Sequence, residues 1–429
     1  MKNYFLIGII LFFIFLYSSC SFLNNDESSV NGPNYSIPIL WKSEFLKYHP
    51  TQIISNENGI YAYNFTGNHF LTVRLNRLDP ENGEIIWSTE YFENIDMYQP
   101  IISNNYIYAG IEHNEIICFD IENGSKLARV KIALDNENID IFRVTSDYYL
   151  YDNYLYFGFG NYDIYDYTLA RIDLNSIIKD GNNQEQIIEP ELLWKSHYNS
   201  RIRSRPVVYN DIVYCSTIRL DSGIPIELAG VDINTKEEIF YDSFGNYSDF
   251  CLDAGSEKNP LYIKDNVLYY LSWSIAAYKL SNYQKLYHIR FYHNTPEEED
   301  YSMYEYLDAT FHNNKIYYTT SFSNYYGSSY HNIFCVDESN GKLVWSDIPK
   351  KSESLGSKPI IFDNKLFIQH MNGVRVYNAD TGKLLGIDKT IDGDSSCFNQ
   401  LIDNKMITVM YTKGYRDNLC QIVALDLSR

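Results

Sequence analysis

Residues 307–345 read LDATFHNNKIYYTTSFSNYYGSSYHNIFCVDESNGKLVW, and this stretch decides the fold of the chain. It contains four short apolar runs separated by three polar connections. The first two runs flank Asn313-Asn314, and the last two flank ESNG at 338–341. Asn and Gly tolerate the left-handed backbone that tight hairpin turns need. The stretch therefore predicts one four-stranded antiparallel sheet.

The rest of the chain repeats this stretch. Copies of the Asn313-Asn314 turn stand at Asn104-Asn105, Asp152-Asn153, Asn210-Asp211, Asp265-Asn266, Asp363-Asn364 and Asp403-Asn404, with a looser copy at Asn56–Gly59. The eight copies follow one another at steps of 40 to 58 residues. Repeats of this length are typical of solenoids and propellers.

The turn before the fourth run also recurs. Full copies occur at Asp79–Gly83, Asp120–Gly124, Asp337–Gly341 and Asn378–Gly382, and degenerate copies at Asp173–Ile177, Asp232–Lys236 and Lys279–Tyr283. Trp87 and Trp345 each follow the turn glycine by four residues, and Trp194 ends an expanded third repeat.

The last repeat lacks its fourth strand, because the chain stops at Arg429. An unassigned segment near the other end, ILWKS at 39–43, matches the fourth strand LLWKS at 192–196. We therefore expect an all-β fold: an eight-bladed β-propeller of four-stranded antiparallel blades, formed by residues 37–429. The N-terminal strand closes the last blade, which leaves few unpaired sheet edges.

The complete motif at Cys335–Trp345 resembles the tryptophan-docking repeat of pyrroloquinoline-quinone (PQQ) type propellers. That resemblance implies that each Trp packs between neighbouring blades and that each Asp carboxylate accepts hydrogen bonds within its turn. The docking residues implied here are Trp41, Asp79, Gly83, Trp87, Asp120, Gly124, Trp194, Asp337, Gly341, Trp345 and Gly382.

Residues 1–19 have the pattern of a signal peptide, with Lys2 as their only charge and an apolar core from Tyr4 to Leu16. This core is shorter than the ~20 apolar residues of a membrane-spanning helix. The following LYSSCS at 16–21 resembles a bacterial lipoprotein cleavage site, which makes Cys20 the lipidated residue. The alternative is an ordinary signal peptide with Cys20 as a structural thiol.

Residues 20–36 are polar and rich in Asn and Ser, which predicts a flexible tether. Ser21 follows Cys20 where enteric lipoproteins carry an Asp that retains them in the inner membrane. The absence of that Asp favours an anchor in the outer membrane, facing the periplasm.

The net charge is −20, and removal of residues 1–19 takes away one lysine, which gives 34 − 55 = −21. Such a body repels nucleic acid, so we expect no nucleic-acid partner, and we expect a monomer. The six cysteines after Cys20 are scattered over different repeats, which favours buried free thiols over disulfides.

Two Tyr-rich insertions, 161–167 and 323–331, join second to third strands, so we expect them on one face of the propeller. A third, 292–306, joins two blades and belongs to the other face. Tyr-rich loops can form adaptable recognition surfaces. The candidate binding residues are Tyr162, Tyr165, Tyr167, Tyr325, Tyr326 and Tyr330. The alternative is that these rings fold onto the tops of the blades.

No catalytic, cofactor-binding or metal-binding residues are predicted, because the chain has no Gly-x-Ser-x-Gly, phosphate-loop or zinc motif.

The signal segment, anchor and eight repeats resemble the BamB family of outer-membrane β-barrel assembly lipoproteins. That resemblance implies a non-enzymatic scaffold without a cofactor, whose partners are envelope proteins. One alternative is a PQQ-dependent quinoprotein dehydrogenase, although the chain lacks the adjacent cysteine pair common in that group. Another is a surface-exposed lipoprotein that binds a ligand or glycan.

Overall fold

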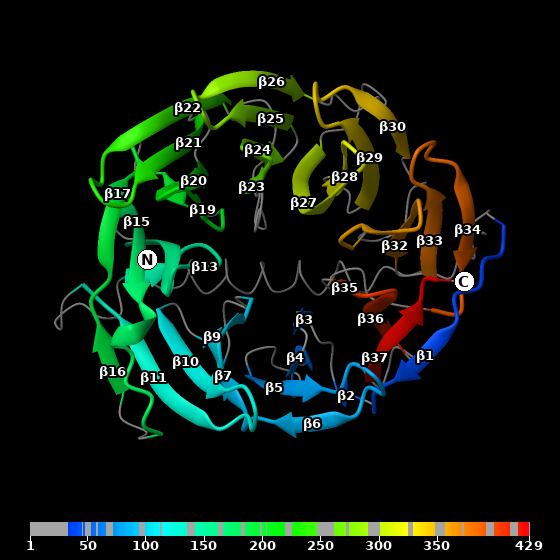
Figure 1. Cartoon of the computed structure of the whole chain (residues 1–429), viewed down its shortest axis with the longest axis horizontal. Helices are drawn as coiled ribbons and strands as arrows, with labels where there is room; N and C mark the ends of the chain where they lie inside the picture. The colour runs from blue at the N-terminus through cyan, green and yellow to red at the C-terminus, as the bar shows by residue number, and fades with distance from the viewer. Residues whose placement is uncertain are drawn as a thin grey trace, which may run out of the picture.

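The computed structural model describes residues 33–44, 46–47, 53–56, 59–65, 72–93, 99–111, 114–134, 142–161, 166–181, 185–197, 200–202, 204–218, 225–246, 261–271, 274–290, 301–324, 329–347, 357–370, 373–391, 399–411 and 419–428. Over these ranges the chain is built of β-strands, with one short 3-10 helix, η1 (Leu174–Ser176). Eight separate sheets stand around a ring (Figure 1). The predicted eight-bladed, all-β propeller is confirmed.

Each blade is an antiparallel meander that runs from the centre of the ring to its rim. Blade 1 consists of β3 (Ile53–Asn56), β4 (Gly59–Phe65), β5 (Thr72–Leu78) and β6 (Ile85–Ser88), with β7 (Phe92–Glu93) paired to β5. Blade 2 consists of β8 (Ile101–Ser103), β9 (Tyr106–Gly110), β10 (Glu115–Asp120) and β11 (Lys126–Ile132). Blade 3 consists of β12 (Phe142–Val144), β13 (Tyr149–Tyr151), β14 (Tyr154–Asn161), β15 (Asp166–Asp173) and β17 (Glu191–Lys195).

The middle blades keep this order. Blade 4 consists of β18 (Arg201–Ile202), β19 (Val207–Tyr209), β20 (Ile212–Ile218), β21 (Pro225–Asp232) and β22 (Glu238–Asn246). Blade 5 consists of β23 (Leu261–Lys264), β24 (Val267–Leu271), β25 (Ser274–Lys279) and β26 (Gln284–Arg290). Blade 6 consists of β27 (Tyr301–His312), β28 (Lys315–Asn324), β29 (Ser329–Asp337) and β30 (Leu343–Asp347).

The last two blades complete the ring. Blade 7 consists of β31 (Ile360–Phe362), β32 (Lys365–His370), β33 (Gly373–Asn378) and β34 (Leu384–Asp388). Blade 8 consists of β35 (Gln400–Ile402), β36 (Lys405–Tyr411), β37 (Leu419–Asp426) and β1 (Ile39–Lys42), with β2 (Leu46–Lys47) also paired to β37. In blade 8, Trp41 pairs with Ala424 and Lys42 with Val423. The N-terminal strand therefore closes the last blade, as predicted.

The hairpin turns explain why Asn and Asp recur between first and second strands. The backbone φ angle is +48° at Asn313 and +57° at Asn314, and it is also positive at both turn residues of blades 3, 4, 5 and 7. Side chains of L-residues rarely adopt this conformation, and Asn and Asp tolerate it best.

The interior consists of apolar clusters that lie between neighbouring blades. Tyr156 on β14, for example, packs with Leu169 of its own blade and with Val213 and Cys215 of blade 4. Many tyrosines are fully buried in this way, among them Tyr61, Tyr63, Tyr214, Tyr270, Tyr317 and Tyr377. Four cysteines are buried free thiols: Cys118, Cys215, Cys335 and Cys420.

Three features differ from the sequence-based expectation. Residues 301–306, expected in a loop, form the first half of the long strand β27. A further strand, β16 (Glu185–Ile188), runs parallel to β11 and makes blade 2 five-stranded. Residues 33–36, expected in the tether, lie beside β34, where Asn34 forms a parallel bridge with Ile387. Within the described ranges there is no helix long and apolar enough to span a membrane.

Candidate functional site

Tryptophans on the outermost strands connect one blade to the next. The Trp41 indole N–H donates to the Pro80 carbonyl over 3.0 Å, linking blade 8 to blade 1. Trp87 donates to the Ile121 carbonyl over 3.1 Å, linking blade 1 to blade 2. In blade 6, Trp345 bonds in the same way to Ala379 of blade 7, over 2.8 Å. In each case the acceptor is the second residue of the next blade's outer turn.

Three of the turn glycines make room for an indole ring. A Cβ on Gly124 would lie 2.6 Å from Trp87 Cε3, and one on Gly83 would lie 2.3 Å from Trp41 Cε3. Gly382 makes the same close approach to Trp345. These glycines also have positive φ angles, which residues with a side chain rarely adopt. Glycine is therefore favoured at this position for two reasons: the backbone conformation and the close approach of the ring.

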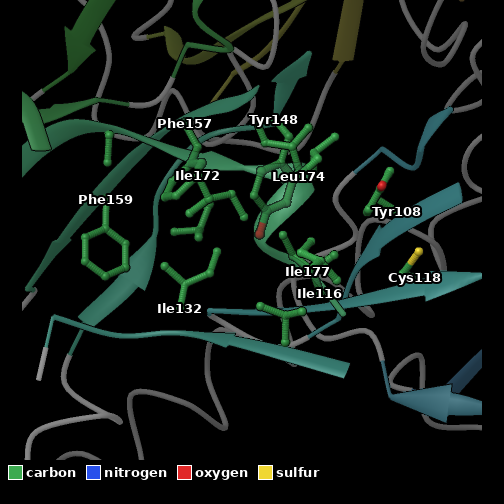
Figure 2. Packing of buried hydrophobic residues seen from close by; sticks show 14 of the residues in the cluster. Tyr108, Ile116, Cys118, Ile132, Tyr148, Phe157, Phe159, Ile172, Leu174 and Ile177 are labelled. Carbon is green, nitrogen blue, oxygen red and sulfur yellow. The ribbon is translucent and has the colours of Figure 1, made fainter. Parts of the chain in front are cut away.

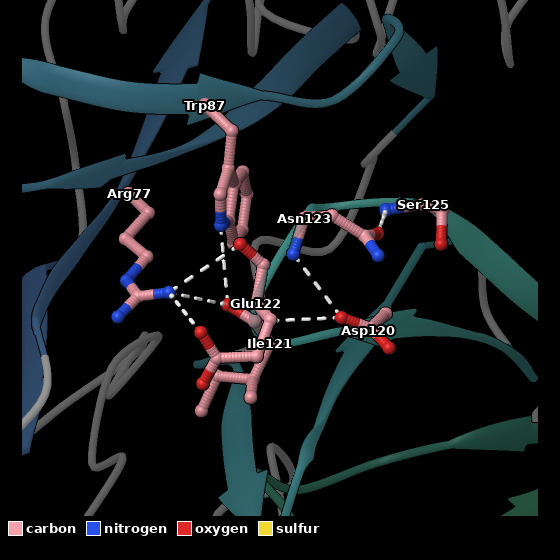
Figure 3. A network of polar contacts seen from close by, with 7 residues as sticks. All are labelled: Arg77, Trp87, Asp120, Ile121, Glu122, Asn123 and Ser125. Carbon is pink, nitrogen blue, oxygen red and sulfur yellow. Dashed lines mark hydrogen bonds and ion pairs between the residues drawn. The ribbon is translucent and has the colours of Figure 1, made fainter.

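Figure 3 shows this arrangement around Trp87. The Asp120 carboxylate accepts the backbone N–H groups of Glu122 and Asn123, over 2.8 and 3.1 Å. Arg77 donates to the Ile121 carbonyl that also receives the Trp87 N–H, and pairs with the Glu122 carboxylate. In other turns, Asp79 accepts the N–H of Glu81, and Asp337 accepts the N–H of Ser339.

Two blades use another aromatic residue. Tyr287 of blade 5 packs over Gly341 and donates its hydroxyl to the Glu338 carbonyl, over 2.8 Å. Phe240 of blade 4 faces a turn without glycine, and its ring stacks on Tyr283 at a centroid distance of 5.3 Å. An aromatic side chain therefore sits at the same strand position in five of the eight blades, opposite the residue two places before the outer turn. In blade 3 this position is occupied by Glu191, and Trp194 pairs with Leu169 instead.

Blades 2 and 7 have small residues at this position, Ala128 and Gly386. In these two blades another segment of the chain runs parallel to the outermost strand: β16 beside β11, and residues 33–36 beside β34. Ile188 of β16 packs against the cluster between blades 2 and 3, part of which is shown in Figure 2. Tyr35 packs against the cluster between blades 7 and 8. In blades 2 and 7 an added segment thus lies beside the outermost strand where the docking aromatic is missing.

The contact between blades 3 and 4 departs from both patterns. The turn of blade 4 has Lys236, also at a positive φ, where the docking turns have glycine. At the docking glycines an added Cβ would clash with the indole ring. The Trp194 N–H instead donates to the Glu238 carboxylate over 2.8 Å. The same oxygen lies 2.7 Å from His197 Nε2. The His197 ring forms T-shaped contacts with Trp194 and Tyr241, at centroid distances of 5.8 and 4.8 Å.

We call Trp194, His197, Glu238 and Tyr241 the blade 3–4 seam. The Trp194 side chain is buried, whereas the His197 side chain is 48% exposed and Tyr241 is 38% exposed. Leu192 and Ile239, on the same two outer strands, are also exposed apolar residues. The seam therefore combines aromatic, imidazole and carboxylate groups at the rim.

A buried carboxylate holds the segment that carries His197. Glu227 is fully buried; it accepts the His197 backbone N–H over 3.1 Å and the Thr217 hydroxyl over 3.2 Å. The Ser196 N–H donates to the Tyr167 carbonyl of β15. These bonds fix the backbone from which the His197 ring projects.

An ion-pair network also spans blades 3 and 4. Glu191 pairs with Arg171 of blade 3 over 2.7 Å and with Lys236 of blade 4 over 3.1 Å. Partial burial raises the pKa of the Glu191 carboxyl, but hydrogen bonds from Arg171 and Lys236 outweigh it, so the pKa is lowered overall.

The six candidate tyrosines of the loops are placed as follows. Tyr162, Tyr165, Tyr325 and Tyr326 lie outside the described residues. Tyr330 lies in β29, paired with Phe322. Tyr167 lies in β15 and is only 4% exposed. The expected position of Tyr167 and Tyr330 in open loops is therefore corrected. The strands on either side show that both insertions do join second to third strands.

Metal ligation has no candidate in the described ranges, because no three His, Cys, Asp or Glu side chains there are grouped closely enough to hold an ion. Sequence reasoning missed His197 and Glu238, which are 41 residues apart and meet only across the seam. The one sequence feature that could have indicated an unusual contact between blades 3 and 4 was Lys236 in place of the turn glycine.

Comparisons with known proteins reveal similarity of structure only. No family model and no curated protein sequence matches the chain. BamB from Moraxella catarrhalis has a similar structure, with a TM-score of 0.55, 11% identity, and coverage of 89% of this chain and 96% of BamB. The chain shares the BamB-type propeller fold.

Enzymes have the same fold. Quinohemoprotein alcohol dehydrogenase from Comamonas testosteroni matches with a TM-score of 0.62 and 9% identity, covering 92% of this chain and 77% of the enzyme. A europium-containing methanol dehydrogenase matches with a TM-score of 0.61 and 12% identity, covering 92% of this chain and 95% of the enzyme. At these identities the likeness establishes the fold and leaves the activity to be argued from the residues.

Proposed function

We propose that this protein is a lipid-anchored, non-enzymatic scaffold of the cell envelope that binds a protein partner at the blade 3–4 seam. The partner proposed is a component of the outer-membrane β-barrel assembly machinery. The lipid anchor is placed at Cys20, on an outer membrane and facing the periplasm. The resemblance to the BamB family supports this assignment, and the composition of the seam supports the place of contact.

The observation that carries the proposal is the exposure of His197 and Tyr241 around the buried Trp194. Aromatic residues are enriched at protein interfaces, because they offer a large apolar area together with a polar tip. Glu227 accepts a hydrogen bond from the His197 backbone, and Glu238 lies within hydrogen-bond distance of the His197 ring. His197 is therefore already positioned before a partner binds, and little conformational entropy is lost on binding.

A pull-down from detergent-solubilised membranes tests the proposal. We compare the wild-type chain with Tyr241→Ala and with a matched control, Tyr91→Ala, which removes an exposed tyrosine of blade 1. Wild type and control should recover β-barrel assembly components, and Tyr241→Ala should recover at least fivefold less. Absence of these components from the wild-type sample, or equal recovery by all three proteins, would overturn the proposed partner or the proposed surface.

A quinoprotein dehydrogenase is the second candidate, because the two dehydrogenases match the chain with TM-scores of 0.61 and 0.62. The chain has no two adjacent cysteines, which is the feature that commonly stacks on the quinone in that group. Incubation with quinone and calcium, followed by a dye-reduction assay with alcohols, separates the two functions. Turnover would favour the enzyme. Protease shaving of intact cells then distinguishes a periplasmic scaffold from a surface-exposed lipoprotein that binds a ligand or glycan.

A further inference from the structure

Residues 33–37, here called the strap, fix the place where the chain leaves the propeller. The Tyr35 N–H donates to the Ile387 carbonyl over 3.0 Å, and the Ile387 N–H donates to the Pro33 carbonyl over 2.9 Å. The Ile37 N–H donates to the Asp388 carboxylate over 2.6 Å. The strap therefore adds to β34 of blade 7 before the chain enters β1 of blade 8.

Where β34 contacts the strap, there is no room for a side chain larger than that of Gly386. A Cβ on Gly386 would lie 2.8 Å from the Pro33 carbonyl oxygen and 2.8 Å from Tyr35 Cβ. Asp388 is fully buried, and it also accepts the N–H and hydroxyl of Thr390. Tyr35 and Ile37 pack into the apolar cluster between blades 7 and 8. Main-chain bonds, close packing and a buried carboxylate thus hold the strap against the rim.

The distance from the strap to the proposed anchor is short. Twelve residues, 21–32, separate Cys20 from Pro33. A chain of that length spans at most about 40 Å. The blade 3–4 seam lies on the opposite side of the ring from blades 7 and 8 (Figure 1). The rim of blades 7 and 8 is therefore the part of the ring that the shortest stretch of chain connects to the proposed anchor at Cys20.

The side chains on this rim suit a membrane surface. Lys42 on β1 is exposed, as are Lys383 and Lys389 on either side of β34, although the body as a whole is strongly acidic. Leu40 on β1 is 46% exposed. Exposed lysines outnumber exposed acidic residues along this rim, where the acidic ones are Glu44 and Asp380. On the outer strands of blades 3 and 4 the order is reversed, with Glu189, Glu237 and Glu238 exposed against Lys195 and Lys236. Lysines close to anionic headgroups each favour membrane contact, and acidic residues oppose it.

We propose that the rim of blades 7 and 8 is the surface that faces the lipid bilayer, and that the strap holds it there, with the blade 3–4 seam turned away from the membrane. This orientation rests on the lipid anchor of the proposed function. It leaves the seam free for a protein partner on the side remote from the lipid.

Photocrosslinking to lipid tests the orientation in the full-length lipidated protein. A photoreactive phenylalanine replaces Thr381 of blade 7 in one variant and Thr235 of blade 4 in another. The two threonines are exposed and occupy the same position in their turns. The proteins are bound to vesicles of phosphatidylethanolamine and phosphatidylglycerol that contain labelled lipid. We expect at least fivefold more lipid crosslinking at position 381 than at position 235, and equal or reversed yields would overturn the orientation.

Two further variants separate this inference from the proposed function. Cys20→Ala should abolish vesicle binding, and if it leaves binding unchanged, the proposed anchor fails. Tyr35→Ala should keep vesicle binding but bring the ratio of the two crosslinking yields close to one. A ratio that stays high in Tyr35→Ala would show that the strap does not set the orientation.

Discussion

The space between the outer strands of two neighbouring blades is filled in different ways in blades 1 and 2 and in blades 7 and 8. In the first, Trp87 covers Gly124 and donates a hydrogen bond to the next blade. In the second, the corresponding residue is Gly386, and a separate segment of the chain lies over it. A large side chain can come from the repeat itself or from elsewhere in the chain, but the space between the outer strands is filled in both. The comparison separates contacts that the repeat encodes from contacts that depend on the rest of the fold.

The largest effect should follow from removing the ring in the first contact. Trp87→Ala leaves a cavity over Gly124 and removes the bond to Ile121, so we expect a loss of about 3 kcal/mol in the free energy of unfolding, measured with denaturant. Trp87→Phe keeps most of the packing and should lose about 1 kcal/mol. Equal losses in the two variants would show that the hydrogen bond, and not the ring, stabilises the contact.

The strap contact should respond to a change on either side. Gly386→Ala forces a Cβ against Pro33 and Tyr35 and should cost about 2 kcal/mol of unfolding free energy. Tyr35→Ala should cost a similar amount, about 2 kcal/mol, through lost packing. Because both changes displace the same segment, the double variant should lose less than the sum of the two. Full additivity would indicate that the two residues do not act on one contact.

The blade 3–4 seam should be less sensitive than either of these. Glu238→Ala removes the acceptor of the Trp194 N–H, and we expect a loss of about 1–2 kcal/mol in unfolding free energy. Glu237→Ala, at the neighbouring exposed position, is the matched control and should have little effect. If the two variants unfold at the same denaturant concentration, the Glu238 bond contributes nothing to the seam.

The smallest effect should be the pH dependence of the Glu191 network. The folded-state pKa of Glu191 is lowered, so its contribution is complete above the carboxyl's ordinary pKa of about 4.5 and is lost as pH falls through the folded-state value. The Glu191 side chain is 37% exposed, so solvent screens the pair and the contribution should stay below about 1 kcal/mol. Glu191→Gln should be less stable than wild type at pH 7, and this difference should shrink as the pH falls below 4.5. A difference independent of pH would assign the effect to packing.

Much of the architecture was predictable from the sequence, because each blade depends on local turn chemistry. Asn313-Asn314 and its copies mark hairpins that require a left-handed backbone, and a glycine four residues before Trp345 marks a docking turn. The match between the Trp41 and Trp194 segments predicted how the ring closes. The hairpin turn occurs eight times and the docking turn seven times, three of them degenerate, so a degenerate copy in one blade does not hide the pattern.

The added strands were not predictable in the same way. β16 is a four-residue run inside an expanded repeat, and the strap is polar enough to resemble a tether. Both are held largely through main-chain hydrogen bonds, which leave no side-chain periodicity in the sequence. The seam was missed because its residues come from two repeats, and neither repeat alone contains the pair.

The sequence by itself determined the number of blades, the turns between strands and the residues that dock by a repeated motif, since all of these depend on neighbours within about fifty residues. Only the tertiary structure decided which segments fill the spaces beside Ala128 and Gly386, and that Glu238 is shared by Trp194 and His197. The physical reason is that a gap between two blades can be filled by any segment that fits its shape and satisfies its hydrogen bonds. Which segment does so depends on how the whole ring closes.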